Sequence, residues 1–416
     1  MSHNTLILAV ASFATLGVVT RPLRIPEYVW AVAGAVVMIA FGLLPWRDAV
    51  AAAAKGIDVY LFLIGMMLLA EVGRQQGLFD WLAALAVRHA RGSARRLFLI
   101  IYGVGTLVTV FLSNDATAVV LTPAVYAAAT AARVEPLPYL FICAFIANAA
   151  SFVLPISNPA NLVIFGAHMP PLAQWLYQFT LPSMTSILTT YLVLRFTQRA
   201  ALDQGISEDF RTEPLSIGGK TVAVGIALTA VALLGASSLD WQLGLPTFTA
   251  ATAVTIIVLI IRRRSPLPVL RDISWGVLPL VAGLFTLVAG IEQTGILNSV
   301  TQMLHNVAAT SPREASFGAG IIVALVSNLM NNLPTGLVAA TVSQSADVPL
   351  HVTSGILIGV DLGPNLSVTG SLATILWLIA LRREGEVVTA WQFLKLGIVV
   401  MPAALVVALL AITALA

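Results

Sequence analysis

The chain has 416 residues, of which 58% are hydrophobic and 10% are charged. This much apolar sequence excludes a single soluble domain and predicts a membrane protein with many spans. Cys143 is the only cysteine, which excludes a disulfide framework and a cysteine-based zinc cluster. The formal net charge is +3, but in a membrane protein the placement of the basic residues is more informative than their sum.

Apolar runs follow the same order in the two halves of the chain. The first half has runs at 5–21, 27–45, 57–78, 97–112, 116–132, 138–167 and 172–194. The second half has runs at 221–238, 246–261, 274–291, 315–326, 333–345, 350–381 and 396–415. The fourth and fifth runs of each half are short, and at about 1.5 Å per residue they cover only part of a hydrocarbon core of about 30 Å. We interpret each short pair as a re-entrant hairpin.

A fixed spacing indicates that the second half repeats the first. Gly65, Gln75 and Gly77 stand 218 residues before Gly283, Gln293 and Gly295, and two Ser-Asn pairs at the hairpin tips stand 214 residues apart. Five crossings and one hairpin per half place the second half upside down relative to the first. The predicted fold is an all-α polytopic membrane protein, an inverted repeat of two five-helix units with about 10 transmembrane helices plus 2 hairpins. The predicted boundaries are 1–198 for the first repeat, 199–219 for a cytoplasmic linker and 220–416 for the second repeat.

The basic residues support this arrangement. If the loop holding Arg88 to Arg96 is cytoplasmic, only Arg47, Lys55 and Arg313 of the 22 basic residues fall outside. Both termini are then extracytoplasmic. A chain of twelve full spans remains an alternative if the hairpins cross completely.

Helix breakers interrupt one apolar run in each half. Pro155 and Pro159 flank Ser157 and Asn158 in LPISNPANLVIFG, and Gly363-Pro364-Asn365 interrupts the corresponding run of the second half. Proline lacks an N–H group and disfavours helix at the preceding residue, so backbone carbonyl groups are freed there. Within a membrane such groups are tolerated where they are buried in protein or line a wet cavity. A kink satisfied by neighbouring helices is the structural alternative for either break alone.

Both hairpin tips are polar. They contain Ser113, Asn114 and Asp115 in the first half and Ser327, Asn328, Asn331 and Asn332 in the second. These residue types are preferred helix N-caps, which is one explanation for them. Capping is also compatible with ligand binding, because a helix N-terminus presents N–H donors. Matched polar breaks in two halves are typical of a secondary transporter with its site near the bilayer midplane.

Few charged residues lie inside the predicted spans, and they are Glu71, Arg74, Asp115, Glu292 and Asp361. Glu71 and Arg74 are three residues apart on one helix face, so we expect them to pair with each other. Glu292 lies at the end of a span and is expected to reach the interface. Asp115 and Asp361 each belong to a break, and an intramembrane carboxylate is a functional candidate.

The motifs resemble those of the ion transporter superfamily. The strings FLSNDATAVVLTPAV, LPISNPANLVI and LGPNLSVTGSLATILW are similar to the ArsB arsenite efflux permeases, and the resemblance covers nearly the whole chain. It implies export of trivalent arsenic and antimony from a prokaryotic cell across its inner membrane in exchange for protons. It also implies optional docking of a cytoplasmic arsenite-stimulated ATPase. Sodium-coupled relatives carry Ser-Asn-Thr at their tips, whereas Asp115 and Leu329 occupy the third position here, which favours a proton as the coupled ion.

The motifs and this resemblance together define the candidate site. The residues predicted to bind substrate are Ser113, Asn114, Asn158, Asn161, Ser327, Asn328, Asn331 and Asn365. Asp115 and Asp361 are predicted to carry the coupled proton. Arsenous acid is uncharged at neutral pH, so amide and hydroxyl groups can hold it without an arginine. A thiolate site would need several cysteines, and Cys143 is interpreted as a packing residue.

Other functions were compared with arsenite export. A sodium/proton antiporter or a carboxylate or oxyanion symporter of the same superfamily remains an alternative, distinguished by sodium dependence and by a cationic residue in the cavity. An intramembrane enzyme would need Asp115 and Asp361 as a catalytic dyad, and we expect no enzymatic activity. PLSIGGKT resembles a phosphate loop, but Pro214 occupies the position of its first glycine. We therefore expect no nucleotide or other cofactor, no metal site and no nucleic-acid partner.

Overall fold

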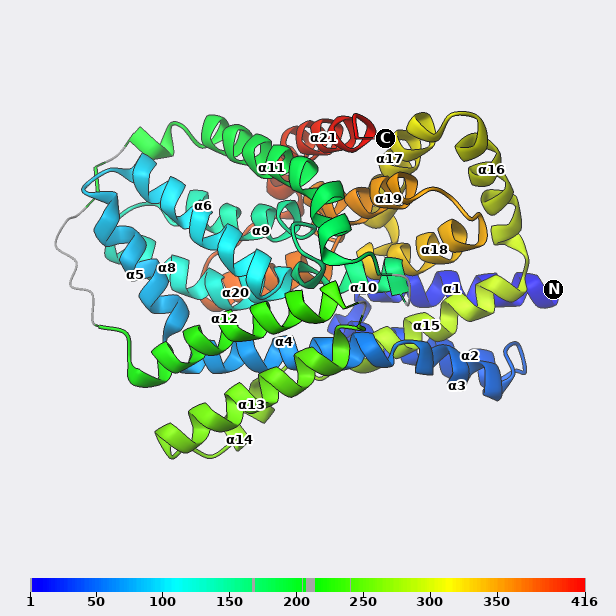
Figure 1. Cartoon of the computed structure of the whole chain (residues 1–416), viewed down its shortest axis with the longest axis horizontal. Helices are drawn as coiled ribbons and strands as arrows, with labels where there is room; N and C mark the ends of the chain where they lie inside the picture. The colour runs from blue at the N-terminus through cyan, green and yellow to red at the C-terminus, as the bar shows by residue number, and fades with distance from the viewer. Residues whose placement is uncertain (1, 167–168, 204, 207–213, 240, 416) are drawn as a thin grey trace.

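The computed structural model describes residues 2–166, 169–203, 205–206, 214–239 and 241–415, and these residues are helical without a regular sheet (Figure 1). The first half contains α1 (His3–Thr20), α2 (Glu27–Ala40), α3 (Trp46–Lys55), α4 (Ile57–Gln75), α5 (Leu78–Ala90), α6 (Ala94–Phe111), α7 (Asn114–Ala116), α8 (Thr122–Ala131), α9 (Leu137–Ala149), α10 (Pro159–Phe165) and α11 (Leu172–Thr197). The second half contains α12 (Ile217–Ser238), α13 (Gly244–Arg262), α14 (Leu267–Asp272), α15 (Val277–Gln293), α16 (Ile296–Thr310), α17 (Pro312–Met330), α18 (Asn332–Ser345), α19 (Leu350–Leu362), α20 (Leu372–Arg383) and α21 (Ala390–Thr413). Short 3-10 or π segments complete the breaks at η1 (Pro22–Arg24), η2 (Thr117–Leu121), η3 (Pro155–Ser157), η5 (Ala201–Asp203) and η6 (Gly363–Asn365).

The helices of the second half repeat those of the first, and helices of one half pack on helices of the other. Helix α4 of the first half packs on α13 of the second, and α15 of the second packs on α2 of the first. Glycine permits both contacts, because a Cβ atom on Gly65 would meet the backbone of Thr247 and one on Gly283 would meet the backbone of Ala31. The predicted fold class, an all-α inverted repeat with hairpins and broken helices, is confirmed.

Five of the described helices are individually long and apolar enough to cross a membrane. The pairs α3–α4 and α15–α16 also pass that test together, but they are bent by 46° and 83°. Helices α5 and α16 were not among the expected spans. Each follows a glycine at φ +71°, Gly77 or Gly295, where the left-handed backbone turns the chain.

The first arm of each hairpin is longer than the sequence indicated. Helix α6 has 18 residues and α17 has 19, against the expected 97–112 and 315–326. Residues 94–96 and 312–314, which include arginine or glutamate, add a turn at the N-terminus of each helix, and residues 327–330 add a further turn at the C-terminus of α17. Hydropathy therefore located the apolar part of each arm and missed the more polar turns beside it.

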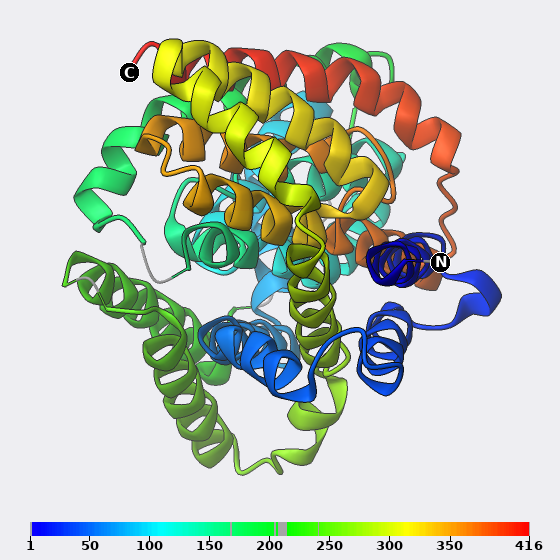
Figure 2. The same ribbon diagram turned by 90° about the vertical axis from the view of Figure 1, so that its right-hand side faces the viewer.

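The helices form two groups. Figure 2 shows α2, α4 and α13–α15 together in the lower part of the molecule, and α11, α17, α19 and α21 in the upper part. The hairpins and the broken helices pack against these groups, and the side chains of their polar motifs are mostly buried in protein. The repeat boundaries 1–198, 199–219 and 220–416 stay a prediction, and Arg211 of the linker lies outside the described residues.

Two ends of the molecule are distinguished by their connections. The α5–α6 and α13–α14 connections lie toward the left of Figure 1, and the α2–α3 and α16–α17 connections lie toward the right. Arg88 to Arg96 and Arg262 to Arg271 belong to the left-hand end, which we name the basic end. The positive-inside rule predicts that the basic end is cytoplasmic.

Candidate functional site

Four helices begin within the protein at the matched breaks, and a side chain caps each of them. Ser113 Oγ accepts a hydrogen bond from Ala116 N at 3.1 Å at the start of α7, and Asn158 Oδ1 accepts one from Ala160 N at 3.0 Å at the start of α10. Asn331 caps α18 and Ser371 caps α20 in the same way. The capping interpretation of the hairpin tips is therefore correct for Ser113 and Asn331. In α10 and α18 the other first-turn N–H groups are bonded within the protein or belong to proline, whereas Leu372 N and Ala373 N of α20 have no partner among the described residues. Such unpaired groups at a helix start are available to an oxygen-bearing ligand.

The two hairpins match in a different register from the one that the Ser-Asn pairs indicated. Ser327 and Asn328 lie in the last turn of α17, before the tip, so they do not correspond to Ser113 and Asn114. The structural partner of Ser113 is Asn331, which keeps the 218-residue spacing of the glycines. Thr117 and Thr335 share this spacing and bond to the carbonyl oxygens of Ser113 and Asn331. The 214-residue pairing was wrong because Ser-Asn is too short a motif to fix the register.

Asp361 joins the two broken helices. One carboxylate oxygen accepts a hydrogen bond from Asn158 Nδ2 at 2.7 Å, and the other lies 2.6 Å from Ser151 Oγ. Asp361 and Ser151 are 0% exposed, and Asn158 is 1% exposed. A carboxylate excluded from water needs such donors, because leaving it without partners would be costly.

Asn365 forms a second link between the broken helices. Its Oδ1 accepts a hydrogen bond from Asn148 Nδ2 at 2.9 Å, and its Nδ2 donates to Phe145 O at 3.0 Å. Asn148 was missed by the sequence analysis although it lies in the apolar string FICAFIANAA. Asn148 lies near the end of α9, and Asp361 lies 213 residues later, near the end of α19. An alignment of these two helix ends would therefore have found Asn148.

Three buried amide oxygens near the breaks lack a hydrogen-bond partner among the described residues. They belong to Asn148, Asn161 and Asn332. Asn161 Nδ2, by contrast, lies within 3.3 Å of three carbonyl oxygens at the break, those of Ser151, Leu154 and Pro155. Asn161 therefore stabilises the break and leaves its own oxygen free.

The second hairpin is bonded to the loop that follows η6. Asn328 Nδ2 donates to Ala324 O at 2.8 Å and to Gly363 O at 2.9 Å, and Asn328 Oδ1 accepts from Ser367 Oγ at 2.7 Å. Asn332 N donates to Gly370 O at 2.8 Å. Ser327, in contrast, donates to Val323 O of its own helix. Asn328 thus joins the hairpin to the break, whereas Ser327 does not.

Asp115 has a different environment from Asp361. It is partly buried and lines a cavity of about 70 Å³ together with Ser113, Glu71 and Asp272. Among the described residues, no hydrogen bond or ion pair reaches its carboxylate group. Asn114, beside it, turns its Oδ1 to Asp115 N at 2.9 Å. This cavity, which we name the inner cavity, lies toward the basic end.

A larger cavity of about 670 Å³ lies toward the opposite end, and we name it the outer cavity. Helices α10, α15 and α18 line it, with Lys55, Asp58 and Glu292 as its charged residues. Glu292 was expected to reach the interface, but its carboxylate accepts a hydrogen bond from Thr341 Oγ1 at 2.8 Å. The internal repeat relates the two cavities. Helices α10 and α18 line the outer cavity, and their counterparts, α20 and the hairpin arm that begins with α7, line the inner cavity.

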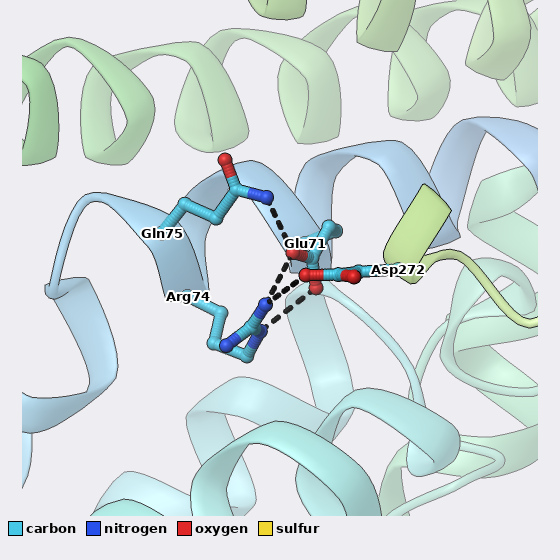
Figure 3. A network of polar contacts seen from close by, with 4 residues as sticks. All are labelled: Glu71, Arg74, Gln75 and Asp272. Atoms are coloured by element: carbon cyan, nitrogen blue, oxygen red, sulfur yellow. Dashed lines mark hydrogen bonds and ion pairs between the residues drawn. The ribbon is translucent and has the colours of Figure 1, made fainter. Parts of the chain in front are cut away.

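An ion cluster adjoins the inner cavity (Figure 3). Arg74 donates to both carboxylate oxygens of Glu71, at 2.8 and 2.6 Å, which confirms the predicted pair. The same guanidinium group donates to Asp272 at 2.9 Å, and Gln75 donates to Glu71 at 2.7 Å. Asp272 was not predicted, because it belongs to the other repeat. Among the described residues, no group of three His, Cys, Asp or Glu side chains could hold a metal ion.

Comparisons with known proteins agree on transport. Residues 15–360 match the family described as "CitMHS: Citrate transporter". The arsenical pump membrane protein of Escherichia coli K12 is 27% identical over 352 residues, which cover 81% of each chain. An uncharacterized transporter of Mycobacterium tuberculosis is 25% identical over 417 residues, which cover 95% of each chain. The crystal structure of the Alcanivorax borkumensis YdaH transporter, described as having an unusual topology, has a TM-score of 0.60 at 15% identity and covers 89% of this chain and 87% of its own.

Proposed function

Because the chain belongs to the citrate transporter family, and is thus a multi-pass membrane transporter, we propose that it exports arsenite and antimonite by proton antiport. The similarity to arsenical pump membrane proteins of bacteria supports this choice of substrate. It also supports the inner membrane of a prokaryotic cell as the location. The proposal includes no catalytic step and no cofactor.

The observation that carries the proposal is the chemical character of the buried site. The side chains bonded across the two breaks carry amide, hydroxyl and carboxylate groups, and no Lys or Arg is among the described partners. A multiply charged anion held at this depth would need cationic partners. A neutral trihydroxide such as arsenous acid needs donors and acceptors only. The free N–H groups at the start of α20 and the unpartnered amide oxygens supply both.

Asp115 is the proposed proton carrier. It lines a cavity toward the basic end, and its carboxylate is free of partners among the described residues, so a proton can bind without breaking an internal hydrogen bond. Asp361 is the second candidate. Protonation there would change its bonds to Ser151 and Asn158 and so alter the contact between the two halves. In an antiport cycle, proton binding from one side would release the neutral solute to that side.

The test is a flux assay on the purified protein in liposomes. Arsenite movement is measured under an imposed pH gradient, with and without sodium, while a dye reports the internal pH. The proposal expects arsenite movement that depends on the pH gradient, is independent of sodium and is accompanied by a matching proton flux. Arsenite movement that requires sodium, or none at all in protein shown to be folded, would refute it.

A carboxylate symporter is the second candidate, and the description of the family favours it. The same liposomes distinguish the two functions when labelled citrate replaces arsenite. The neutral site argues against citrate, so we expect no citrate uptake and no inhibition of arsenite flux by excess citrate. Sodium-dependent citrate uptake would establish the alternative. A sodium/proton antiporter would be recognised by proton release on addition of sodium alone.

A cytoplasmic arsenite-stimulated ATPase is an optional partner in this proposal. The connections rich in arginine at the basic end are the surface predicted to face it. Flux in liposomes that contain only this chain would show that the partner is not required.

A further inference from the structure

Two ion-pair positions lie at opposite ends of the molecule and are related by the internal repeat. The first joins Arg74, at the end of α4, to Asp272, the last residue of α14, at 2.9 Å (Figure 3). The α4 helix belongs to the first repeat and α14 to the second. This contact therefore crosses from one half to the other beside the inner cavity, which Asp272 lines.

The 218-residue spacing places Glu292 at the position of Arg74 in the second repeat. Helix α3 corresponds to α14, and its last residue is Lys55, which the same spacing places opposite Ile273, the residue after Asp272. The outer position therefore combines Glu292, at the place of Arg74, with Lys55, one residue from the place of Asp272, and the charges are reversed. Both Lys55 and Glu292 line the outer cavity, and no ion pair joins them in the described part of the chain. Glu292 is instead bonded to Thr341 in α18 of the second hairpin.

Whether each ion pair is formed correlates with the volume of the cavity beside it. The formed pair stands beside the cavity of about 70 Å³, and the unformed pair stands beside the cavity of about 670 Å³. We propose that Arg74–Asp272 and Lys55–Glu292 are reciprocal gate contacts. The inner pair holds the basic end closed in the arrangement seen here, and the outer pair forms when the outer cavity closes and the inner cavity opens.

The geometry suits a contact that must form and break in each cycle. The Arg74 and Asp272 side chains are 44% and 45% exposed, so water competes for both charges. An exposed ion pair of this kind shifts an equilibrium by a factor of about two to five. This is enough to bias the two arrangements and too little to lock either one. Glu71 is buried and bonds to both Nε and Nη2 of Arg74, so it positions the guanidinium group toward Asp272.

The inference requires only that the chain is a transporter, and its test needs no transported solute. Two reporters are made in a Cys143→Ser background, Met67→Cys in the inner cavity and Leu297→Cys in the outer cavity. Membrane-impermeant maleimide is applied to right-side-out and inverted vesicles, and the labelling rate of each reporter is measured. A failed arsenite assay would leave these rates interpretable.

Removing each pair should move the two reporters in opposite directions. Asp272→Asn should raise labelling of Met67→Cys and lower that of Leu297→Cys by about two- to fivefold, because it weakens the closed inner end. Lys55→Gln should do the reverse, because it weakens the pair that closes the outer end. Asp272→Glu and Lys55→Arg keep the charges and serve as matched controls. The double variant Lys55→Glu with Glu292→Lys restores an outer pair and should return both rates toward the parent values.

Asp48→Asn is a further control at the outer end, since within the described part of the chain Asp48 accepts a single hydrogen bond, from Gln293 at 3.2 Å, and forms no ion pair. It should leave both rates unchanged. The inference is overturned if Asp272→Asn and Lys55→Gln shift the reporters in the same direction, or if neither shifts them. It is equally overturned if the charge-reversed double variant behaves like the sum of its single substitutions.

Discussion

Asp361 and Asp115 are the carboxylates of the two breaks, and the protein treats them in opposite ways. Asp361 is 0% exposed and bonded to Ser151 and Asn158 of the other repeat. Asp115 lines a cavity, and its carboxylate has no partner in the described part of the chain. The bonded carboxylate joins the two halves, whereas the free one can exchange a proton without disturbing the fold. Asp115, at the start of a hairpin arm, and Asp361, near the end of α19, thus have different physical roles.

Asp361→Ala is expected to have the largest effect, because it removes the carboxylate that joins the two halves. The substitution leaves Asn158 Nδ2 without its acceptor and removes a partner of Ser151, both in a site without water access. Each unsatisfied group costs about 1–3 kcal/mol, so we expect a large loss of thermal stability in detergent and little folded protein. Asp361→Asn keeps the size and one acceptor, and should recover much of the folded yield. Wild-type melting of Asp361→Ala would show that the link does not hold the halves together.

Asp115→Asn should separate transport from folding. Asparagine keeps the size of the side chain but cannot titrate, and no bond to the Asp115 carboxylate is lost. We therefore expect a melting temperature close to wild type and retained arsenite binding, with loss of flux driven by a pH gradient. Flux and pH are measured together in liposomes. If arsenite and proton movement stay coupled in this variant, the proton travels elsewhere and Asp361 becomes the carrier to test.

The sequence predicted the fold class but not helices α5 and α16, and it predicted the arrangement of the site only in part. Hydropathy, paired helix breakers and the 218-residue spacing predicted the inverted repeat, because these features act over whole helices. Contacts between the repeats could not be predicted, since Ser151, Asn148 and Asp272 gain their partners only when the halves pack. The Ser-Asn pairs indicated the wrong register because Ser113-Asn114 begin a helix, whereas Ser327-Asn328 lie in the last turn of one. Which side chains contact substrate remains a prediction.

Asn328 and Ser327 provide a matched pair in the second hairpin. Asn328 bonds to Gly363 and Ser367 across the break, whereas the Ser327 side chain bonds, among the described residues, to Val323 of its own helix alone. Asn328→Ala should lower stability by about 0.5–1.5 kcal/mol for each lost hydrogen bond and reduce flux, because the bonds to Gly363 O and Ser367 Oγ are lost while Leu366 N still donates to Gly363 O. Ser327→Ala should stay within about 0.5 kcal/mol of wild type and retain flux. Loss of flux in Ser327→Ala with unchanged melting would show that its hydroxyl contacts substrate after all.

Cys143→Ser should have the smallest effect and sharpens the comparison by removing a third candidate ligand. Cys143 lies in α9 and is 0% exposed, and the chain contains no second cysteine. Trivalent arsenic bound through sulfur needs several thiolates, and one buried thiol cannot supply them. Serine is smaller and more polar, so a modest loss of stability is expected, with most arsenite flux and resistance retained at equal expression. If flux falls to background while the protein remains folded, sulfur is a ligand, and neither the amide groups nor the two carboxylates can be the whole of the site.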